Sequence, residues 1–221
     1  MSILISIDGN IGSGKSTLLH MLENNLNSHC LGEFANDYEF VFLQEPVNEW
    51  ENIKNNNGES IISLFYKNQK QYSFSFQMMA YISRLNEIKK YMNSNKKVII
   101  ISERSVHTDK HVFAKMLYDE NLMEDVNYKI YNKWFDCFIS EVPLKGVVYL
   151  DVHPRLCQER VKKRKRNGED IPMSYLENCK KYHDVYISQY DHLTLNGDDV
   201  LENNKNKFIR EIGSYIYQLV S

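Results

Sequence analysis

The sequence predicts an α/β fold in which helices cover a parallel sheet. Three features predict it: short apolar strand-like runs, longer helix-like segments between them, and a glycine-rich loop between the first run and the first helix. Strands that alternate with helices are typical of βαβ units, whose strands pair in parallel. Because 221 residues can bury one substantial core, we expect a single domain spanning residues 1–221.

The predicted strands are the apolar runs Leu4–Ile7, Phe40–Leu43, Lys97–Ser102 and Gly146–Leu150. The third run is apolar almost throughout, which predicts a strand covered on both faces and therefore central in the sheet. Helical periodicity is present in Lys15–Asn27, Lys70–Asn93, Val106–Tyr118, Val126–Ser140, Pro154–Arg166, Pro172–Tyr190 and Asn203–Leu219. The Asn-rich stretch from Asn52 to Gly58 is polar and turn-favouring, so we expect a surface loop there.

The composition argues against several classes of protein. A net charge of −2, from 27 Lys and Arg against 29 Asp and Glu, gives no positive field to attract nucleic acid. No run of about 20 apolar residues suggests a membrane span. Because the cysteines are widely spaced, with no CxxC motif or leader-like start, we expect reduced thiols and a cytoplasmic location. These cysteines are Cys30, Cys137, Cys157 and Cys179.

A glycine-rich stretch lies between the first predicted strand and the first predicted helix. It fits the pattern GxxxxGK[ST] and comprises Gly9, Asn10, Ile11, Gly12, Ser13, Gly14, Lys15, Ser16 and Thr17. Glycines allow a tight turn whose N–H groups point at phosphate oxygens, and the helix N-terminus adds a positive dipole end. Lys15 supplies a charge for the β- and γ-phosphates, and Ser16 offers a hydroxyl to Mg²⁺. The pattern predicts nucleoside triphosphate binding but leaves the acceptor open.

Charged residues follow the second and third predicted strands. Glu45-Pro46-Val47 comes after the second strand, with Trp50 close behind, and Glu103-Arg104-Ser105 follows the third. The carboxyl ends of parallel strands line the ligand crevice of such a sheet, so these residues are expected beside the glycine-rich loop. An isolated Glu is more often a solvated loop residue. Two carboxylates and a guanidinium that converge on one crevice instead favour a catalytic site.

Together with further motifs, these residues resemble the deoxynucleoside kinase family, which includes deoxycytidine, deoxyguanosine and mitochondrial thymidine kinases. The further motifs are Tyr66, Phe76-Gln77, Asp109, the basic segment Arg160–Arg166 and the stretch from Glu169 through Pro172 to Tyr175-Leu176. The resemblance extends from Ser6 to about Leu195. It implies a P-loop kinase fold, with a central parallel five-stranded sheet flanked by helices and an Arg-rich lid. The implied reaction is transfer of phosphate from ATP, with Mg²⁺, to the 5′-hydroxyl of a deoxynucleoside in nucleotide salvage.

The resemblance also implies roles for single residues. Glu45 would be the general base for the 5′-hydroxyl, with Arg104 holding it and stabilising the transferred charge, and Glu103 would join Ser16 at Mg²⁺. The sugar 3′-hydroxyl would bind Tyr66 and Glu169, although Asp170 remains an alternative to Glu169. Gln77 would pair with the base edge, and Phe76 and Phe113 would sandwich the ring. The pocket walls would be Ile11, Trp50, Ile62 and Phe65.

Ala80, Arg84 and Asp109 match the positions that divide family members by base preference. An Arg–Asp pair there resembles the deoxycytidine, deoxyadenosine and deoxyguanosine kinases, which favours deoxycytidine or a purine deoxynucleoside over thymidine. Alternatively, Asp109 would cap a helix and Arg84 would be a surface residue. The resemblance further implies a lid at about 160–171, with phosphate or donor-base contacts from Arg160, Arg164, Arg166 and Asp198, and a homodimer formed through Lys70–Asn93 and Val126–Ser140.

Three other interpretations are weighed against the nucleoside kinase. A thymidylate kinase would need an arginine for the acceptor phosphate, whereas an alcohol acceptor needs a base such as Glu45. A catalytically silent subunit with this fold is disfavoured by the intact Lys15, Ser16 and Arg104. A GTPase would carry a guanine-reading NKxD sequence, which this chain lacks. The expected partners are therefore ATP and a small deoxynucleoside, with neither nucleic acid nor membrane.

Overall fold

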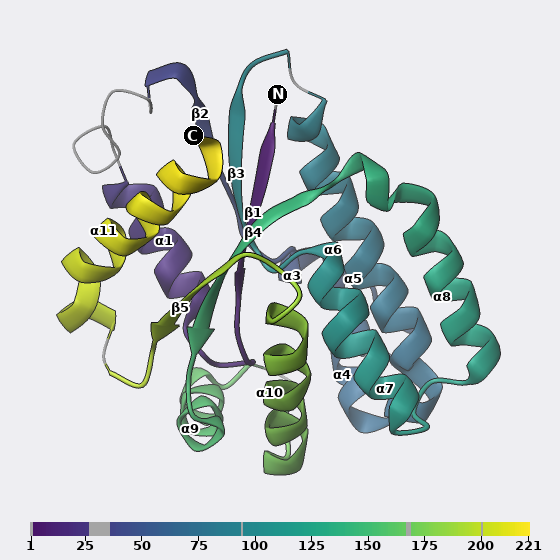
Figure 1. Ribbon diagram of the computed structural model, residues 1–221. Coiled ribbons are helices and arrows are strands. Elements are labelled where there is room, and N and C mark those ends of the chain that lie inside the picture. Colours follow the sequence, from purple (N-terminus) through teal and green to yellow (C-terminus); the bar gives the residue numbers. More distant parts are fainter. Residues whose placement is uncertain (1, 27–35, 94, 167–168, 200) are drawn as a thin grey trace.

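In the computed structural model, which describes residues 2–26, 36–93, 95–166, 169–199 and 201–221, a parallel sheet forms the centre of the molecule (Figure 1). The strand order is β2-β3-β1-β4-β5 and all four pairings are parallel, which confirms the predicted fold class. The strands are β1 (Ile3–Asp8), β2 (Glu39–Leu43), β3 (Val98–Glu103), β4 (Leu144–Asp151) and β5 (His192–Asn196).

The two most completely buried strands lie inside the sheet. β1 is in the middle, and β3, buried along its whole length, lies between β1 and β2. Their register pairs Ile5 with Ile101 and Ser6 with Ser102, so apolar side chains from both strands enter the layers above and below the sheet. The interior position expected for β3 is confirmed. β5 is the strand that the sequence pattern missed, because polar residues alternate with leucine in His192–Asn196 and its burial is only partial.

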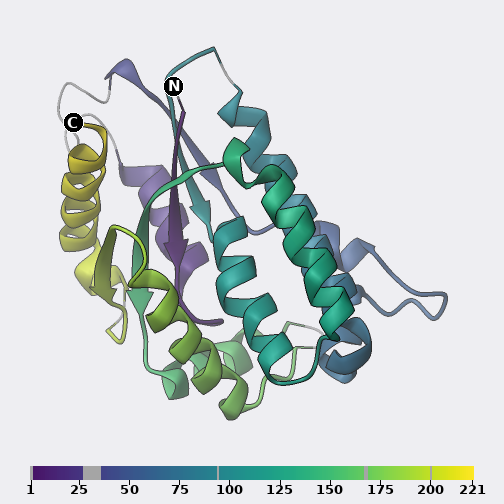
Figure 2. The same cartoon turned by 45° about the vertical axis from the view of Figure 1, so that its right-hand side comes forward.

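Helices cover both faces of this sheet. Figure 1 shows α1 (Lys15–Asn25) and α11 (Leu201–Val220) on one side and α5 (Gln69–Met92) and α8 (Asp125–Phe138) on the other, and Figure 2 shows α8 alongside α5. Helices α9 (Pro154–Arg164) and α10 (Met173–Ile187) follow β4. These helices match the predicted segments to within three residues at each end. Asn27, the predicted end of the first helix, lies outside the described residues.

Two short helices that the sequence analysis did not predict follow β2. They are α3 (Val47–Asn52) and α4 (Ile61–Lys67), and the polar loop expected between them is confirmed. The Ser60 hydroxyl caps α4 by accepting a hydrogen bond from the Ser63 N–H at 3.3 Å. Helices of about two turns carry too few apolar positions to establish a 3.6-residue period, which is why tertiary packing rather than pattern defines them.

The helix predicted over Val106–Tyr118 is present but not uniform. It begins as α6 (Val106–Thr108), continues as a π-helical segment over Asp109–Ala114 and ends as α7 (Lys115–Asp119). A π-helical turn inserts a residue into the helical repeat and re-aims the side chains around it, and such turns are frequent at functional sites. Here the segment carries Asp109 and Phe113, two residues singled out by the resemblance.

Within the described ranges, no helix has the length and apolar character needed to cross a membrane. The described cysteines Cys137, Cys157 and Cys179 are unpaired thiols, as expected, and Cys30 lies outside the described residues. The predicted helix from Pro154 ends two residues early, at Arg164, because Lys165 adopts a left-handed backbone conformation with φ 52°.

Candidate active site

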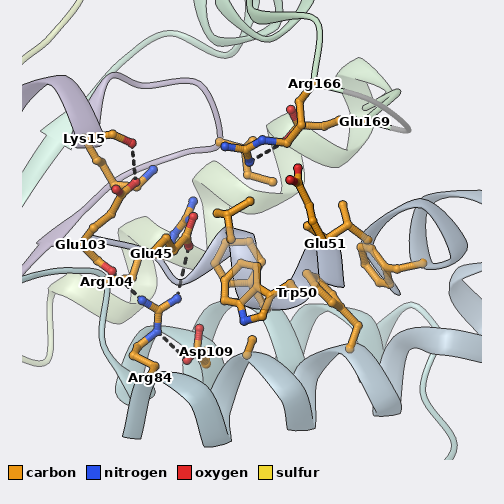
Figure 3. Close-up of a pocket in the computed structure, with 18 of the residues that line it drawn as sticks. Lys15, Glu45, Trp50, Glu51, Arg84, Glu103, Arg104, Asp109, Arg166 and Glu169 are labelled. Atoms are coloured by element: carbon orange, nitrogen blue, oxygen red, sulfur yellow. Dashed lines mark hydrogen bonds and ion pairs between the residues drawn. The ribbon is translucent and has the colours of Figure 1, made fainter. Parts of the chain in front are cut away.

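A cavity of about 370 Å³ opens at the edge of the sheet where β1, β2 and β3 end (Figure 3). All residues that the resemblance assigns to the nucleoside line this one cavity: Glu45, Trp50, Ile62, Phe65, Tyr66, Phe76, Gln77, Ala80, Arg84, Arg104, Asp109, Phe113 and Glu169. Ile11, Gly12, Lys15 and Ser16 of the glycine-rich loop line it too. The structure therefore brings the predicted nucleoside residues and part of the glycine-rich loop to a single crevice, as expected for an open α/β sheet.

The glycine-rich loop is built from backbone conformations that favour glycine. Gly12 and Gly14 have φ values of 81° and 102°. A Cβ on Gly12 would lie 2.5 Å from the carbonyl oxygen of Cys157 in α9, so this residue also allows α9 to approach the loop. The Asn10 side chain fixes the loop to the start of α10, because its Nδ2 donates to the Leu176 carbonyl at 2.8 Å. The loop is held from both flanks before any ligand binds.

Lys15 is buried beneath this loop. Its Nζ donates to the Asn10 carbonyl at 2.8 Å, and the residue is 4% exposed. Burial, reinforced by the nearby Arg104 guanidinium, lowers the pKa of Lys15 to about 8. The ammonium group is therefore charged at neutral pH but lies close to its titration range.

Two oxygen donors meet next to Lys15. Ser16 Oγ donates to Glu103 Oε1 at 3.1 Å, which brings the residue after the loop lysine to the end of β3. Mg²⁺ in phosphate sites usually takes only one or two protein oxygens, with phosphates and water completing its shell. A hydroxyl beside a carboxylate fits that pattern. The described residues contain no cluster of three or more His, Cys, Asp or Glu able to hold a metal by themselves.

Glu45 lies between two arginines. Its Oε1 accepts from Arg104 Nη1 at 2.5 Å and from Arg84 Nη2 at 3.2 Å, and its side chain is 15% exposed. Burial would raise the pKa of Glu45, but the guanidinium groups of Arg104 and Arg84 outweigh burial and lower it to about 2. The carboxylate is consequently ionised and fixed in orientation, and it faces the cavity that Lys15 also lines.

Arg84 connects Glu45 to a second buried carboxylate. Its Nε donates to Asp109 Oδ2 at 2.9 Å and its Nη1 donates to the Glu103 carbonyl at 2.6 Å. Burial raises the pKa of Asp109, although the Arg84 charge opposes that shift. Arg84 is 3% exposed, and Ser105 rather than Asp109 caps the following helix, so the alternative of a surface arginine and a capping aspartate is wrong.

Arg104 adopts a left-handed backbone conformation, with φ 61°. For a residue with a side chain this conformation costs about 1–3 kcal/mol. Its guanidinium lies 4.8 Å from the ring centre of Phe113, and Nη2 donates to the Gly9 carbonyl at 3.3 Å. The Arg104 side chain thereby touches the glycine-rich loop, Glu45 and an aromatic wall of the cavity at once.

Aromatic rings form the deep end of the cavity. Phe65 stacks on Phe76 at 4.7 Å, and Trp50 meets the edge of Phe76 at 5.6 Å. Gln77 is 3% exposed, and its Oε1 has no hydrogen-bond partner among the described residues. A buried acceptor of this kind is normally satisfied, so it marks a place where a ligand N–H could bind. Ring faces beside an amide suit a flat heterocycle with polar edges.

The candidate sugar residues and lid residues meet at the mouth. Glu169 accepts from Arg164 Nη2 at 2.6 Å, and Arg166 lies 3.9 Å away. Glu169 lines the cavity whereas Asp170 is exposed outside it, which favours Glu169 of the two alternatives. Burial and the Glu169 carboxylate raise the pKa of Tyr66, so that its hydroxyl remains a donor. Asn167 and Gly168 of the expected lid lie outside the described residues.

Two residues expected at the donor base do not line the cavity. Arg160 donates to the Ser13 carbonyl at 2.9 Å and to the Gly197 carbonyl at 3.0 Å, so it joins the glycine-rich loop to the turn after β5. Asp198 accepts from the His153 N–H at 2.7 Å and thereby joins that turn to the start of α9. The lysines between the lid arginines, Lys162, Lys163 and Lys165, are exposed.

Sequence reasoning missed several residues of the cavity wall. They are Gln44, Asn48 and Glu51, which lie on or next to α3. Val47 and Tyr175, which the sequence motifs included without a role, line the cavity too. The three missed residues follow β2 closely, and their position after a strand end was the available signal. Without α3 in the prediction, however, nothing indicated which of them face inward.

A family model described as deoxynucleoside kinase matches residues 5–217 of this chain. The chain belongs to the deoxynucleoside kinase family. Human deoxycytidine kinase is 30% identical over 237 residues, which cover 92% of this chain and 86% of the human protein. A probable deoxycytidine kinase of fowlpox virus (strain NVSL) is 31% identical, with 98% and 88% covered. The mitochondrial deoxyguanosine kinase of Xenopus laevis is 28% identical, with 84% and 73% covered.

As a member of this family the chain is a kinase, which confirms the enzyme class expected from its motifs. A catalytically silent subunit and a GTPase switch are therefore not supported. The family also agrees with the five-stranded parallel sheet and with a cavity at its carboxyl edge. Burial brings the pKa of Lys15 to about 8, so its charge changes within a pH range in which activity can be followed.

We expect kcat/KM of the kinase for its triphosphate donor to fall as the pH rises through about 8, because the charged form of Lys15 exists below its pKa. Steady-state kinetics from pH 6 to 10 measure this. At saturating donor, kcat should fall at a higher pH, since bound phosphate stabilises the ammonium group. A kcat/KM that stays constant to pH 10 contradicts the expectation.

Proposed function

We propose that this kinase transfers the γ-phosphoryl group of ATP to the 5′-hydroxyl of a deoxynucleoside, in nucleotide salvage, and that it prefers deoxycytidine or a purine deoxynucleoside to thymidine. The observation that carries the proposal is the position of Glu45, an ionised carboxylate held by two arginines on the wall of the cavity that Lys15 also lines. An alcohol nucleophile needs a proton acceptor at that place, whereas a phosphate acceptor does not.

The donor half of the proposal uses the residues around the glycine-rich loop. Loop N–H groups and Lys15 bind the phosphates of ATP, and Ser16 with Glu103 holds Mg²⁺, which neutralises phosphate charge when bound. Arg104 touches both Glu45 and the Gly9 carbonyl, so it stabilises charge between the attacking oxygen and the loop. Arg164 and Arg166 line the cavity and belong to the lid that we propose closes over the phosphates.

In this mechanism Glu45 orients the 5′-hydroxyl and receives its proton. A carboxylate with a pKa of about 2 is a weak base towards a free alcohol. The proton therefore moves late, once the bond to phosphorus has begun to form and has made the alcohol more acidic. This order suits phosphoryl transfer, whose loose transition state depends more on alignment and charge stabilisation than on early deprotonation.

The acceptor half uses the deep end of the cavity. Tyr66 and Glu169 bind the 3′-hydroxyl, and the crowded site there disfavours a 2′-hydroxyl. Phe76 and Phe113 enclose the base, and Gln77 pairs with its edge through a donor and an acceptor side by side. Asp109, fixed by Arg84, accepts from an exocyclic amine, which deoxycytidine and deoxyadenosine carry and thymidine lacks.

Replacing Glu45, the proposed general base, should lower kcat strongly and leave ATP binding intact. We expect Glu45→Gln to lower kcat by about 10²–10⁴-fold, the usual contribution of general base catalysis, with little change in KM for ATP. Transfer of label from radioactive ATP to the four deoxynucleosides and one ribonucleoside measures it. Glu49→Gln, on the exposed face of α3, is the matched control and should behave as wild type. Wild-type protein that phosphorylates none of these acceptors would refute the proposed function.

Removing the buried Arg84–Asp109 ion pair, which would lie beside the nucleobase, should change which deoxynucleoside the kinase prefers. We expect the double variant Arg84→Met and Asp109→Ala to gain thymidine phosphorylation relative to deoxycytidine, since the amine acceptor is lost and room for a methyl group appears. Relative kcat/KM values in competition measure the change. The exposed pair Lys115–Asp119, replaced in the same way, is the control. Unchanged relative rates would count against the assigned role of the pair.

We also propose that a second copy of the chain packs against α5 and α8. Val126, Ile130 and Trp134 are 58%, 42% and 46% exposed and recur every four residues along α8, so they form one apolar stripe. Ile82 of the adjacent α5 is 49% exposed. A contiguous apolar face of this kind is typical of interaction sites, and an antiparallel or crossed pair of such helices is self-complementary under twofold symmetry.

A charge in this stripe should separate the subunits. We expect wild-type protein to be a dimer and Trp134→Glu to be a monomer, because association would bury an unpaired carboxylate. Light scattering coupled to size-exclusion chromatography measures the mass. Val185→Glu on α10, where the wild-type side chain is 65% exposed, is the control and should leave the mass unchanged. A monomeric wild type would refute the dimer.

A further inference from the structure

Arg104 is a residue of the candidate site that has a side chain and nevertheless adopts a positive φ. Among the described residues other than glycine, positive φ values occur at Arg104, Asn121 and Lys165. Asn121 and Lys165 are exposed, where water can satisfy their peptide groups. Arg104 is 5% exposed, so the polar groups of its peptide need partners inside the protein.

Both backbone polar groups of Arg104 have such a partner. Its N–H donates to the Ile7 carbonyl of β1 at 3.0 Å. Its carbonyl accepts from the Ser102 hydroxyl at 2.5 Å, a contact between a residue of β3 and the first residue after the strand, two positions on. Ser102 is 1% exposed and belongs to a strand whose preceding residues are all apolar, so its hydroxyl is a polar exception there.

The chain beyond Arg104 is fixed by a separate set of contacts. Ser105 begins α6 and shares a capping box with Thr108. Thr108 Oγ1 in turn donates to Asp8 Oδ1 at 2.7 Å, which fastens the start of this helix to the end of β1. The helix start therefore has its own anchor. The peptide that joins Arg104 to Ser105 is held at its N–H by Thr108 Oγ1, at 3.2 Å, and at its carbonyl by the Ser102 hydroxyl.

We infer that Ser102 is a positioning residue for Arg104: its hydroxyl holds the left-handed backbone that aims the guanidinium at Glu45 and Gly9. Without the hydroxyl, the buried carbonyl of Arg104 loses its partner in this conformation, and the strained backbone keeps only the bonds that its flanking N–H groups make to Ile7 and Thr108. The guanidinium then leaves the place where it meets Glu45. This inference rests on the proposed function for its effect on catalysis, but not for the geometry.

Ser6 provides a matched control for Ser102. The two serines are register partners on adjacent strands, and both are fully or almost fully buried. The Ser6 hydroxyl donates to Asp8 Oδ2 at 2.6 Å and, among the described residues, makes no hydrogen bond with Arg104. Ser6→Ala removes the same group from the same layer of the core, so it measures the loss of a buried hydroxyl that donates to Asp8 and not to the Arg104 carbonyl.

The test compares Ser102→Ala, Ser102→Thr and Ser6→Ala with wild type, by kinetics and by thermal unfolding. We expect Ser102→Ala to lower kcat about tenfold, which is the factor expected for one hydrogen bond acting on the transition state, with KM for ATP unchanged. Ser102→Thr keeps the hydroxyl and should retain most of kcat. Ser6→Ala should keep wild-type kcat even where its melting temperature falls. Ser102→Cys, a weak donor of similar size, replaces the alanine variant if that protein does not fold.

Wild-type kcat in Ser102→Ala overturns the inference, and so does an equal loss in Ser6→Ala. Crystal structures of wild type and Ser102→Ala give a readout that does not depend on activity. We expect Arg104 to leave the left-handed region, or its guanidinium to leave Glu45, in the variant alone. An unchanged Arg104 overturns the inference. Wild-type protein with no kinase activity on any nucleoside refutes the proposed function instead, and the crystallographic comparison still decides the positioning role.

Discussion

The buried charges around Glu45 are the constraint on which the site depends. Glu45 and Asp109 supply two negative charges, and Arg84 and Arg104 supply two positive ones, so the cluster is balanced without a ligand. Its members come from the segment after β2, from α5, from the end of β3 and from the π-helical segment. Losing one member leaves an unpaired buried charge, at a cost of about 3–5 kcal/mol. Since whole domains are stable by about 5–15 kcal/mol, this cluster ties the geometry of the site to the stability of the fold.

The same arginines that fix Glu45 make it a weaker base. Two guanidinium groups lower the pKa of Glu45 to about 2, a shift that opposes proton transfer from an alcohol. Orientation of the nucleophile and stabilisation of phosphoryl charge can each contribute several powers of ten to a rate. In a loose transition state they outweigh what a stronger base would add. A firmly held, poorly basic carboxylate is thus consistent with the chemistry of phosphoryl transfer, though it would be a poor arrangement for abstracting a proton from carbon.

Local sequence patterns predicted some parts of the site but not others. The glycine-rich loop could be predicted because its geometry depends on nearby residues, and β3 because its apolar run is continuous. The pairing of Arg84 with Asp109 spans 25 positions, and only the resemblance to a family suggested it. Helix α3, strand β5 and the exact contacts of Arg160 and Asp198 depend on packing between distant segments. The left-handed backbone of Arg104 has no sequence signal, because a glycine there would have predicted it and an arginine does not.

The left-handed backbone of Arg104 costs stability, but the arginine side chain at this position makes contacts that the proposed function needs. Glycine would adopt φ 61° without strain but would remove the guanidinium that joins Glu45, Gly9 and the face of Phe113. An arginine in ordinary strand or helix geometry would keep the charge but direct it elsewhere, because the side chain leaves the backbone along the Cα–Cβ bond. The strain of about 1–3 kcal/mol is therefore tolerable only where hydrogen bonds hold the peptide on both sides. At the end of β3 those bonds come from Ile7 and Ser102, which belong to the two central strands of the sheet. Two interior strands of the sheet thus orient the site residue that has a left-handed backbone.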